Sequence, residues 1–569
     1  MQPLLSSILI AAAVGCLASA IPNDDSAVVW DRVPTSRELE YHDCFDKYKC
    51  AKLILPLDWW DESNKGNVTI AIIKLPAAVS ADDPTFGGTV FIQPGGPGIS
   101  GTHVLRLSQN GYREMLDIPG ERHYELLSID PRGTGQSKPR INCFPGFQLP
   151  MRMMESSGAG SLDLNRDALN FAIAQAKADA VQCEKVHGNF LKYIGTPNVV
   201  HDMVAILDEI ERERSAAKQR PSETDEDANI ELRSAKKHRK SDVARLQYMG
   251  FSYGTRLGNY FASMFPGRVG RMVLDGVCDA DDYANGPDTD TMAAMMFDGC
   301  RGVGSPTCAL SRETYSSGED IKRRVWDWAA QLNEDPLFAI MDDGQRLFIR
   351  GGDIAGFIVE ALYDAVSDSR ALARDLDQAM SGNATGLLSR MYAVLGKLND
   401  KCSDSPTLPL IPTDALGAIT CADGENVANK SNAYWSDYLR QHMAISSPNW
   451  AFRGPFTTPE PSRWPDVPEP GHPAAPLLFM TNRYDPATPL ANARAMSKNH
   501  PGSGVLVQDS MGHCLVAGGM GPCAKNILRK YFASGAVPLE EHTCQPVQDP
   551  WNIARAVFSP KLSYVRHWA

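Results

Sequence analysis

The sequence predicts an α/β fold with a mostly parallel, doubly wound sheet and an inserted, mainly helical segment. From about residue 52 to residue 279, short apolar runs alternate with segments of helical periodicity, a pattern typical of parallel sheets covered by helices. A Gly-x-Ser-x-Gly motif at residues 250–254 stands between such a run and a helix-like segment. From about residue 286 to residue 455, strand signals fade and helical patterns dominate.

The expected strands are short apolar runs separated by turn residues or by helical patterns. They comprise residues 68–73, 88–92, 124–129, 246–249, 271–274, 476–480 and 505–508. Residues 198–207 have the periodicity of an amphipathic helix. Because strands resume only after residue 475, the helical block divides the sheet-forming sequence into two parts.

Residues 211–242 form a polar, highly charged stretch with an acidic cluster at 225–227 and a basic run at 236–240. The basic run alone would suit a nuclear or nucleic-acid signal. The acidic residues just upstream favour a solvated surface insertion instead. The net charge of −12 likewise gives no electrostatic reason to expect nucleic acid or an anionic membrane as a partner.

The first 20 residues carry no charge, and an apolar core precedes an Ala-Ser-Ala cleavage pattern at 18–20. This predicts a signal peptide and a secreted, extracellular protein. The alternative is an N-terminal membrane anchor, but the apolar run is short for a membrane span. We therefore divide the chain into a signal peptide (1–20), the N-terminal part of the core (21–285, with the charged insertion at about 211–242), a helical cap (286–455) and the C-terminal part of the core (456–569).

The chain has 13 cysteines, of which 12 remain once Cys16 leaves with the signal peptide. An even number in an oxidising compartment predicts disulfides, although their connectivity cannot be read from a sequence. Short separations favour three local pairs, Cys44–Cys50, Cys300–Cys308 and Cys402–Cys421. Three Asn-x-Ser/Thr sequons mark potential glycosylation sites on exposed segments, at Asn67, Asn383 and Asn429.

Ser252 lies at the centre of the Gly-x-Ser-x-Gly motif. In a nucleophile elbow, the turn is so tight that only glycine fits two residues before and after the serine, and the hydroxyl projects from the top of the sheet. This hydroxyl becomes an effective nucleophile when a histidine accepts its proton and a carboxylate orients the histidine. The sequence must therefore supply an acid and a histidine at the same edge.

In α/β-hydrolases, the chain order is serine, acid, histidine. Asp485 follows the expected strand at 476–480, and His513 follows the next one, so both lie at strand C-terminal ends, where open α/β sheets bind ligands. Alone, Asp485 would suit a helix N-cap and His513 a surface loop. Their order and position after Ser252 favour a Ser-Asp-His triad.

The oxyanion formed during acyl transfer requires preorganised N–H donors. Tyr253, directly after the nucleophile, is expected to supply one. The glycine-rich loop at 93–98 follows an early strand, and we assign the second donor to Gly96, with Gly95 or Gly98 as alternatives. A plain Gly-Pro turn is the competing interpretation. The loop at 130–137 is interpreted as structural, with Asp130 and Arg132 fixing neighbouring loops, rather than as catalytic.

The motifs at 95–98, 130–137, 250–255, 274–277 and 485–489 together resemble the prolyl and tripeptidyl aminopeptidase family of α/β-hydrolase serine peptidases. Residues 471–544 are similar to the C-terminal region of its secreted tripeptidyl aminopeptidase-like members. The resemblance covers most of the chain after the signal peptide, except the charged insertion and much of the cap. It implies Ser252 as nucleophile, Asp485 as orienting acid and His513 as general base and acid. Two residues depart from the family's pattern. Pro94 stands where the family's oxyanion loop often begins with His, and Cys514 stands where a small or hydroxyl residue commonly follows the histidine. Either change can alter loop geometry.

The resemblance implies hydrolysis near the N-terminus of a peptide, through an acyl-enzyme. Recognition of a free α-ammonium requires carboxylates, and buried ones provide the strongest binding. Asp279, Asp281 and Asp282, just beyond the strand at 271–274, are candidates, as are acids of the cap. The alternative is that these three are solvated loop acids.

A secreted carboxylesterase or small-molecule amidase with the same triad is the alternative function, and the cap decides between the two. A non-catalytic binding protein on the same scaffold is a third hypothesis, which a complete triad and oxyanion loop oppose. The sequence contains no C-x-x-C, H-E-x-x-H, dinucleotide or phosphate-loop motif. We expect a peptide or a small ester or amide as substrate, with no metal, cofactor, nucleic acid or membrane partner; the oligomeric state stays open.

Overall fold

A mostly parallel sheet of 11 strands forms the centre of the protein. The computed structural model describes residues 26–144, 166–218, 243–279, 288–340, 346–391, 413–424, 427, 430–445, 471–547 and 549–551. The strand order is β1-β3-β4-β6-β5-β7-β8-β11-β12-β13, with β2 paired to β3. Pairing is antiparallel at β2–β3, β3–β4 and β4–β6 and parallel elsewhere in this sheet. The predicted α/β class, with a mostly parallel sheet, is confirmed.

Every strand expected from the sequence is present in the sheet. The strands are β1 (Thr35–Ser36), β2 (His42–Cys44), β3 (Tyr48–Pro56), β4 (Asn67–Leu75), β5 (Phe86–Gln93), β6 (His123–Asp130), β7 (Leu246–Phe251), β8 (Val269–Asp275), β11 (Leu477–Tyr484), β12 (Gly504–Met511) and β13 (His542–Cys544). The long β3 was not expected, because Lys49 and Lys52 interrupt its apolar pattern. Its pairing with β4 over eight positions compensates for the weak local signal.

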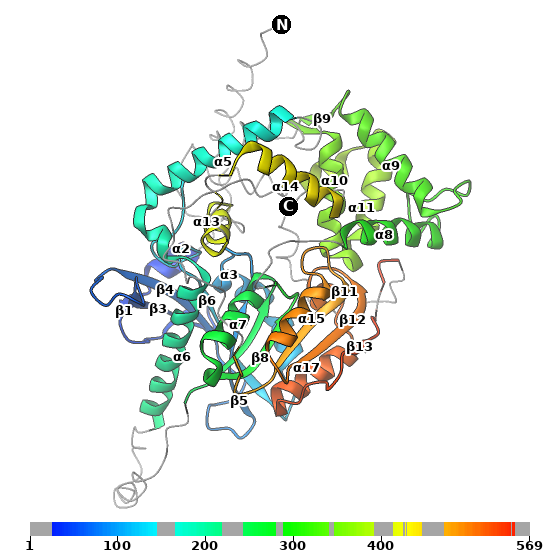
Figure 1. The fold of residues 1–569 in the computed structure, drawn as a ribbon. Coiled ribbons are helices and arrows are strands. Elements are labelled where there is room, and N and C mark those ends of the chain that lie inside the picture. The colour runs from blue at the N-terminus through cyan, green and yellow to red at the C-terminus, as the bar shows by residue number, and fades with distance from the viewer. Residues whose placement is uncertain are drawn as a thin grey trace, which may run out of the picture.

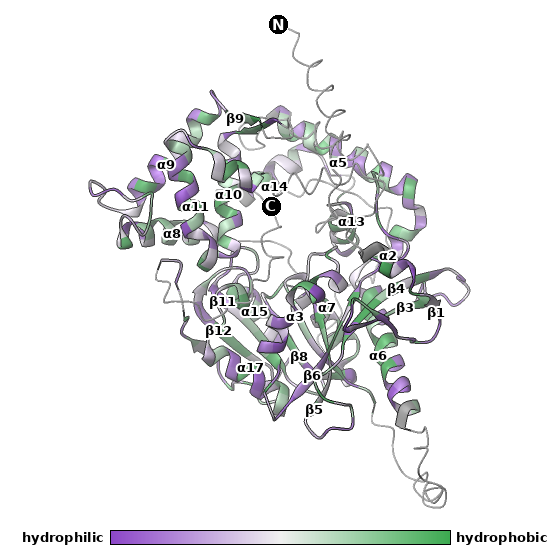
Figure 2. Ribbon diagram, turned by 180° about the vertical axis from the view of Figure 1, so that it is seen from behind, coloured by the Kyte–Doolittle hydropathy of each residue, from purple (hydrophilic) through white to green (hydrophobic). Residues whose placement is uncertain are grey.

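Helices cover both faces of the sheet (Figure 1). One face packs against α6 (Thr196–Lys218), α7 (Tyr253–Met264) and α15 (Leu490–Asn499), and the other against α3 (Gly101–Leu116) and α17 (Pro522–Ser534). Alternate strand residues serve the two faces: in β8, Met272 and Leu274 join the first core cluster, and Val273 joins the second. Figure 2 shows the resulting apolar character of the central strands.

Most of the expected helical cap packs as a separate cluster. It contains α8 (Thr289–Val303), α9 (Gly318–Leu332), the hairpin β9 (Leu337–Ile340) and β10 (Arg346–Ile349), α10 (Gly351–Tyr363) and α11 (Ala365–Met380). Buried residues from these elements, among them Phe297, Ile321 and Ile358, form a third apolar core. In Figure 1, this group lies above the sheet, on the side of β11 and β12.

Two further helices of the same stretch pack elsewhere. The buried alanines and Ile419 of α13 (Thr413–Asp423) belong to the core cluster of α6 and α7. Helix α14 (Asn432–Ile445) packs on α5 (Arg166–His187) through Leu169, Ile173, Trp435 and Leu439. Figures 1 and 2 both show α13 between α5 and the sheet. Helix α13 therefore shares the core formed by the sheet and the helices α6 and α7.

The described residues also form shorter helices. They include α2 (Ser26–Asp31), the 3-10 turns η1 (Gly188–Tyr193) and η5 (Pro266–Arg268), and α16 (Cys514–Ala517). Helix α6 contains the expected helix at 198–207 and continues to Lys218, into the stretch expected as a charged surface insertion; residues 219–242 lie outside the described residues. The division into four segments stays a prediction.

Four disulfides are present in the described part of the chain. Cys44–Cys50 and Cys300–Cys308 confirm two of the predicted local pairs. Cys402 of the third expected pair lies outside the described residues. Cys143–Cys183 and Cys523–Cys544 were not predicted, because their partners meet only through the fold. Among the described helices, none is both long and apolar enough to cross a membrane.

Candidate active site

Ser252 lies in a strained turn between β7 and α7. Its φ of +53° and ψ of −124° are unfavourable for a residue with a side chain, as in a nucleophile elbow. A Cβ on Gly250 would lie 2.5 Å from the carbonyl oxygen of Gly254, and a Cβ on Gly254 would lie 2.5 Å from that of Gln93. The two glycines of the motif are therefore required by contacts on both sides of the serine.

Asp485 and His513 form a buried hydrogen-bonded pair. They follow β11 and β12, and parallel pairing places these strand ends side by side. His513 Nδ1 lies 3.0 Å from Asp485 Oδ1 and 3.2 Å from Oδ2. Thr488 donates to the carboxylate through its hydroxyl and its N–H, both at 2.8 Å, and Cys514 N–H donates at 2.8 Å. The carboxylate therefore has a fixed orientation.

This environment keeps the carboxylate of Asp485 ionised. Burial alone would raise its pKa, but His513 and the surrounding donors more than offset burial and hold the pKa below its usual value. An ionised carboxylate behind Nδ1 selects the tautomer that leaves Nε2 able to accept a proton, and it stabilises the imidazolium. The pair is thus suited to serve as the orienting acid and the base of a triad.

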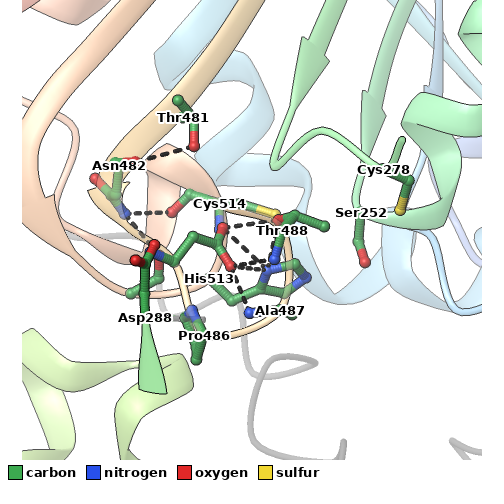
Figure 3. Close-up of polar contacts among 12 residues, drawn as sticks. Ser252, Cys278, Asp288, Thr481, Asn482, Pro486, Ala487, Thr488, His513 and Cys514 are labelled. Atoms are coloured by element: carbon green, nitrogen blue, oxygen red, sulfur yellow. Dashed lines mark hydrogen bonds and ion pairs between the residues drawn. The ribbon is translucent and has the colours of Figure 1, made fainter. Parts of the chain in front are cut away.

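The structure brings Ser252 to the same edge as this pair. Figure 3 shows Ser252, His513 and Cys514 in one close-up, and Asp275 accepts N–H groups both from Ser252 and from Leu515, two residues after His513. The three residues expected to act together therefore converge, although they lie far apart in the sequence.

Asp275, the last residue of β8, connects the two halves of the site. Its carbonyl oxygen accepts the N–H of Ser252 at 3.0 Å, and its carboxylate accepts the N–H groups of Leu515 at 2.6 Å and Val516 at 3.3 Å. Burial and the charge of Asp485 raise the pKa of Asp275 to about 7, against the lowering effect of these donors and of His513. Sequence reasoning did not identify this residue; its position at a strand end was the available signal.

The glycine-rich loop after β5 packs directly against the elbow. Gly95, Gly96 and Gly98 have φ of +107°, +116° and +97°, conformations that glycine adopts without strain. A Cβ on Gly95 would lie 2.5 Å from the carbonyl oxygen of Phe251 and 3.2 Å from the Tyr253 nitrogen. The loop thus adjoins the expected oxyanion donor Tyr253. The contact is made through Gly95, and the assignment of the second donor to Gly96 stays a prediction.

The helical cap contacts both members of the acid–histidine pair. Asp288, which precedes α8, accepts the Asp485 N–H through Oδ2 at 3.3 Å. Tyr363, the last residue of α10, accepts the backbone N–H of His513 through its carbonyl oxygen at 2.9 Å, and its ring meets the imidazole edge to face at 5.0 Å. Neither contact was predicted, because nothing in the local sequence connects these residues to the triad.

Cys514, a departure from the family pattern, is buried beside the nucleophile. Its φ is +65°, and a Cβ on Gly276 would collide with its sulfur. Burial, with the charges of Asp275 and Asp485, raises the pKa of this thiol well above its usual value. A neutral thiol is a poor nucleophile, so this neighbour does not compete with Ser252.

The candidate ammonium ligands and glycosylation sites lie only partly within the described residues. Asp279 is half-buried, and its carbonyl oxygen accepts from Arg256 at 3.4 Å; Asp281, Asp282 and Asn429 lie outside the described residues. Asn67, at the start of β4, and Asn383, after α11, are exposed. Their roles in ammonium binding and glycosylation stay predictions.

Asp130 and Arg132 have the structural role expected of them. The carboxylate of Asp130 accepts from the Thr102 N–H at 2.9 Å and the Gln136 N–H at 2.7 Å. Arg132 Nε pairs with Asp202 at 2.6 Å, and both side chains are fully buried. These contacts join the loop at 130–137 to α3 and α6.

One group of possible metal ligands comes together within the described ranges, formed by Cys523, His542 and Cys544. Cys523 and Cys544 form a disulfide. Metal ligation by cysteine requires the thiolate, so these sulfur atoms do not provide a metal site in this state. Among the described residues around Ser252, Asp485 and His513, no group of three or more possible metal ligands comes together.

Comparisons with known proteins match two regions. Residues 88–301 match the family described as alpha/beta hydrolase fold, and residues 441–544 match TAP-like protein. Ser252 lies in the first region, and Asp485 and His513 lie in the second.

Three relatives align over most of their own length. The chain is 25% identical to Serine protease Hip1 of Mycobacterium tuberculosis over 87% of both chains. It is 23% identical to a Tripeptidyl aminopeptidase of Streptomyces lividans, over 88% of this chain and 84% of the relative. It is also 23% identical to a protein of Mycobacterium tuberculosis named Carboxylesterase B, over 88% of this chain and 86% of that one.

Proposed function

This chain is an α/β hydrolase with a TAP-like C-terminal region, and we propose that it is a secreted serine exopeptidase that cleaves peptides near a free N-terminus. The observation that carries the proposal is the buried Asp485–His513 pair at the sheet edge that also holds the strained Ser252. Two relatives named as a serine protease and a tripeptidyl aminopeptidase support peptide substrates.

The geometry supports a two-step acyl transfer. His513 accepts the proton of Ser252 as its oxygen attacks the peptide carbonyl, and Asp485 stabilises the imidazolium. The Tyr253 N–H, with a donor from the loop of Gly96, binds the oxyanion. The imidazolium then protonates the leaving amine, leaving the N-terminal fragment esterified to Ser252. Water, activated by His513, releases this fragment and regenerates the serine.

The cap gives a physical reason for cleavage near a chain end. Asp288 and Tyr363 bring α8 and α10 into contact with the acid–histidine pair, and Ser252, Asp485 and His513 are all buried. A buried site favours a peptide terminus over the middle of a folded chain. Asp279, Asp281 and Asp282 are retained as candidate ligands of the substrate ammonium.

Export is part of the proposal. Four disulfides in the described chain are typical of proteins from oxidising compartments, and an uncharged apolar N-terminus precedes them. We propose cleavage after residue 20 and glycosylation at the exposed Asn67 and Asn383. Expression in a eukaryotic secretory host, followed by N-terminal sequencing and glycosidase treatment, tests both.

The second candidate function is that of a carboxylesterase. It is favoured by the relative named Carboxylesterase B, which aligns over 88% of this chain. The same triad and oxyanion donors would cleave an ester, because ester and amide hydrolysis share the tetrahedral intermediate. An ester does not require an ammonium site.

A substrate panel distinguishes the two functions. Free and N-acetylated Ala-Ala-Pro-Ala anilides, single-residue anilides and short-chain nitrophenyl esters are assayed with the wild type and Ser252→Ala. Cleavage of free but not acetylated peptides by the wild type alone supports the exopeptidase, and the shortest good substrate gives the number of residues released. Ester turnover without anilide cleavage rejects the peptidase.

A further inference from the structure

A buried carboxylate from α13 reaches the helix that follows the nucleophile. Asp423, the last residue of α13, has a side chain that is 1% exposed. Its Oδ1 accepts the N–H of Thr196 at 2.7 Å, and its Oδ2 accepts the Thr196 hydroxyl at 2.6 Å. The hydroxyl of Tyr253 lies 2.7 Å from Thr196 Oγ1 and donates to Asp423 Oδ2 over 3.3 Å. One carboxylate thus holds two hydroxyl groups.

Packing fixes the position of this carboxylate. Ala415, Ala418 and Ile419 anchor α13 in the core cluster that also contains Tyr253. Thr196 is the first residue of α6, where the unpaired N–H groups of a helix favour an anion. A Cβ on Gly195 would lie 3.2 Å from Asp423 Oδ1, so a glycine permits the close approach.

Asp423 combines the attraction of the buried Arg256 charge with hydrogen bonds to Thr196 and Tyr253. Arg256 Nε lies 3.8 Å from Oδ2, well outside hydrogen-bonding distance. The guanidinium instead donates to Tyr260 Oη at 3.0 Å and to the carbonyl oxygen of Asp423 at 3.3 Å. The short contacts of the carboxylate go to Thr196, which in turn contacts Tyr253.

Tyr253 therefore has two constrained ends. Its backbone N–H begins α7 and adjoins Ser252, where the proposed mechanism places the oxyanion donor. Its side-chain hydroxyl is held by Thr196 and Asp423. Catalytic donors must keep their position to within fractions of an ångström to stabilise charge effectively. Anchoring the ring restricts the rotation and tilt of the residue that bears the donor.

We propose that Asp423, acting through Thr196, is a positioning residue that aligns the Tyr253 N–H in the oxyanion hole. The inference rests on the proposed nucleophile Ser252, but it is independent of whether the substrate is a peptide or an ester. It assigns α13 a role in transition-state stabilisation, separate from substrate recognition.

The test measures the rate at which a fluorophosphonate probe labels the folded enzyme. Such a probe reacts with an activated serine, and its phosphoryl oxygen occupies the oxyanion hole, so the rate reports donor geometry without a known substrate. Wild type and Ser252→Ala are compared first. Absence of Ser252-dependent labelling contradicts the proposed function itself and is distinguishable from failure of the inference.

Variants then separate positioning from stability. Thr196→Val removes the bridging hydroxyl at nearly constant shape, and Tyr253→Phe removes the other hydroxyl; we expect each to slow labelling about tenfold, less than the 10²–10³-fold that loss of a donor typically costs. Thr196→Ser keeps a hydroxyl and is expected to label within about twofold of the wild type. Asp423→Asn removes the charge, and we expect it to slow labelling at least as much as Thr196→Val does.

Tyr531→Phe is the matched control. Tyr531 is a buried tyrosine of α17 whose hydroxyl bonds to the Met272 N–H at 2.7 Å and the Pro476 carbonyl at 2.7 Å. Removal of this hydroxyl is expected to lower the melting temperature without slowing labelling of the folded protein. With the best substrate of the panel, Thr196→Val should lower kcat and leave KM nearly unchanged. Wild-type labelling rates in folded Thr196→Val and Tyr253→Phe would overturn the inference.

Discussion

The carbonyl oxygen of Tyr363 accepts the backbone N–H of His513 at 2.9 Å, and the tyrosine ring packs edge to face on the imidazole at 5.0 Å. Tyr363 ends α10, and His513 follows β12, so this contact joins the cap to the candidate base. The orientation of the imidazole therefore depends on a segment that is inserted between the two parts of the core sequence.

Replacement of the Tyr363 ring tests this dependence. Tyr363→Ala keeps the backbone carbonyl but removes the edge-to-face contact, worth about 0.5–1.5 kcal/mol in typical aromatic pairs. We expect kcat/KM to fall about tenfold, mainly through kcat, because the imidazole gains rotational freedom. Tyr363→Phe keeps the ring, so its kcat/KM should fall less than that of Tyr363→Ala. Equal kinetics for Tyr363→Ala and the wild type would contradict a positioning role.

The oxyanion loop provides a second prediction. A Cβ on Gly95 would lie 2.5 Å from the carbonyl oxygen of Phe251 at a φ of +107°, so Gly95→Ala must displace the loop or the elbow. We expect kcat to fall by about 10²-fold or more. Gly120→Ala is the control, since Gly120 also has a positive φ of +76° but nothing within 4 Å of the added Cβ. It should cost some stability and leave kcat unchanged.

A substitution at Cys514 distinguishes a serine mechanism from a cysteine mechanism. Its backbone N–H, not its sulfur, bonds to Asp485, and burial raises the pKa of its thiol. Cys514→Ser keeps that N–H and a side chain of similar size, so kcat/KM should stay within about threefold of the wild type. A loss comparable to that of Ser252→Ala in steady-state assays would show that the thiol takes part in the reaction.

Protonation of His201 is expected to lower the stability of the folded protein in acid. Its ring stacks on Trp59 at 5.6 Å and meets Phe265 edge to face at 5.0 Å. Burial, with the positive charge of Arg132, lowers its pKa to about 4. A folded-state pKa below the unfolded value of about 6.5 means that the unfolded chain binds the proton first. The contribution of His201 is therefore complete above about pH 6.5 and is lost as the pH falls towards 4.

The measurement is urea unfolding of the wild type and His201→Phe across this range. His201→Phe keeps an aromatic ring and removes the titration. The free energy of unfolding of the wild type should fall by up to about 2 kcal/mol more than that of the variant between pH 6.5 and 4, after allowance for partial exposure. Parallel pH profiles would contradict the prediction.

The sequence predicted the parts of the site that local patterns encode. The elbow required Gly250 and Gly254, which contacts on both sides of Ser252 explain. Asp485 and His513 were found because they follow two apolar runs, which form adjacent parallel strands. The strands were predicted where their runs were apolar, and β3 was missed where two lysines interrupt the pattern.

Residues that reach the site from remote elements could not be predicted in the same way. Asp423 lies 170 positions from Tyr253, and Tyr363 contacts His513 from the end of a cap helix. Periodicity shows which face of a helix is buried but not which partner it meets. Asp275 belongs to the sequence motif at 274–277, but its role could not be predicted, because its contacts with Ser252 and Leu515 exist only after β7, β8 and β11 have paired.

The most direct measurement traps the acyl-enzyme. The wild type is mixed with the best free N-terminal peptide anilide or peptide ester, quenched in acid within the first turnover, digested and analysed by mass spectrometry, with Ser252→Ala and His513→Ala in parallel. The proposed mechanism predicts that the mass of the N-terminal fragment is added to the peptide containing Ser252 in the wild type and is absent from both variants. Turnover without any adduct on Ser252, or with the adduct on another residue such as Cys514, would contradict it.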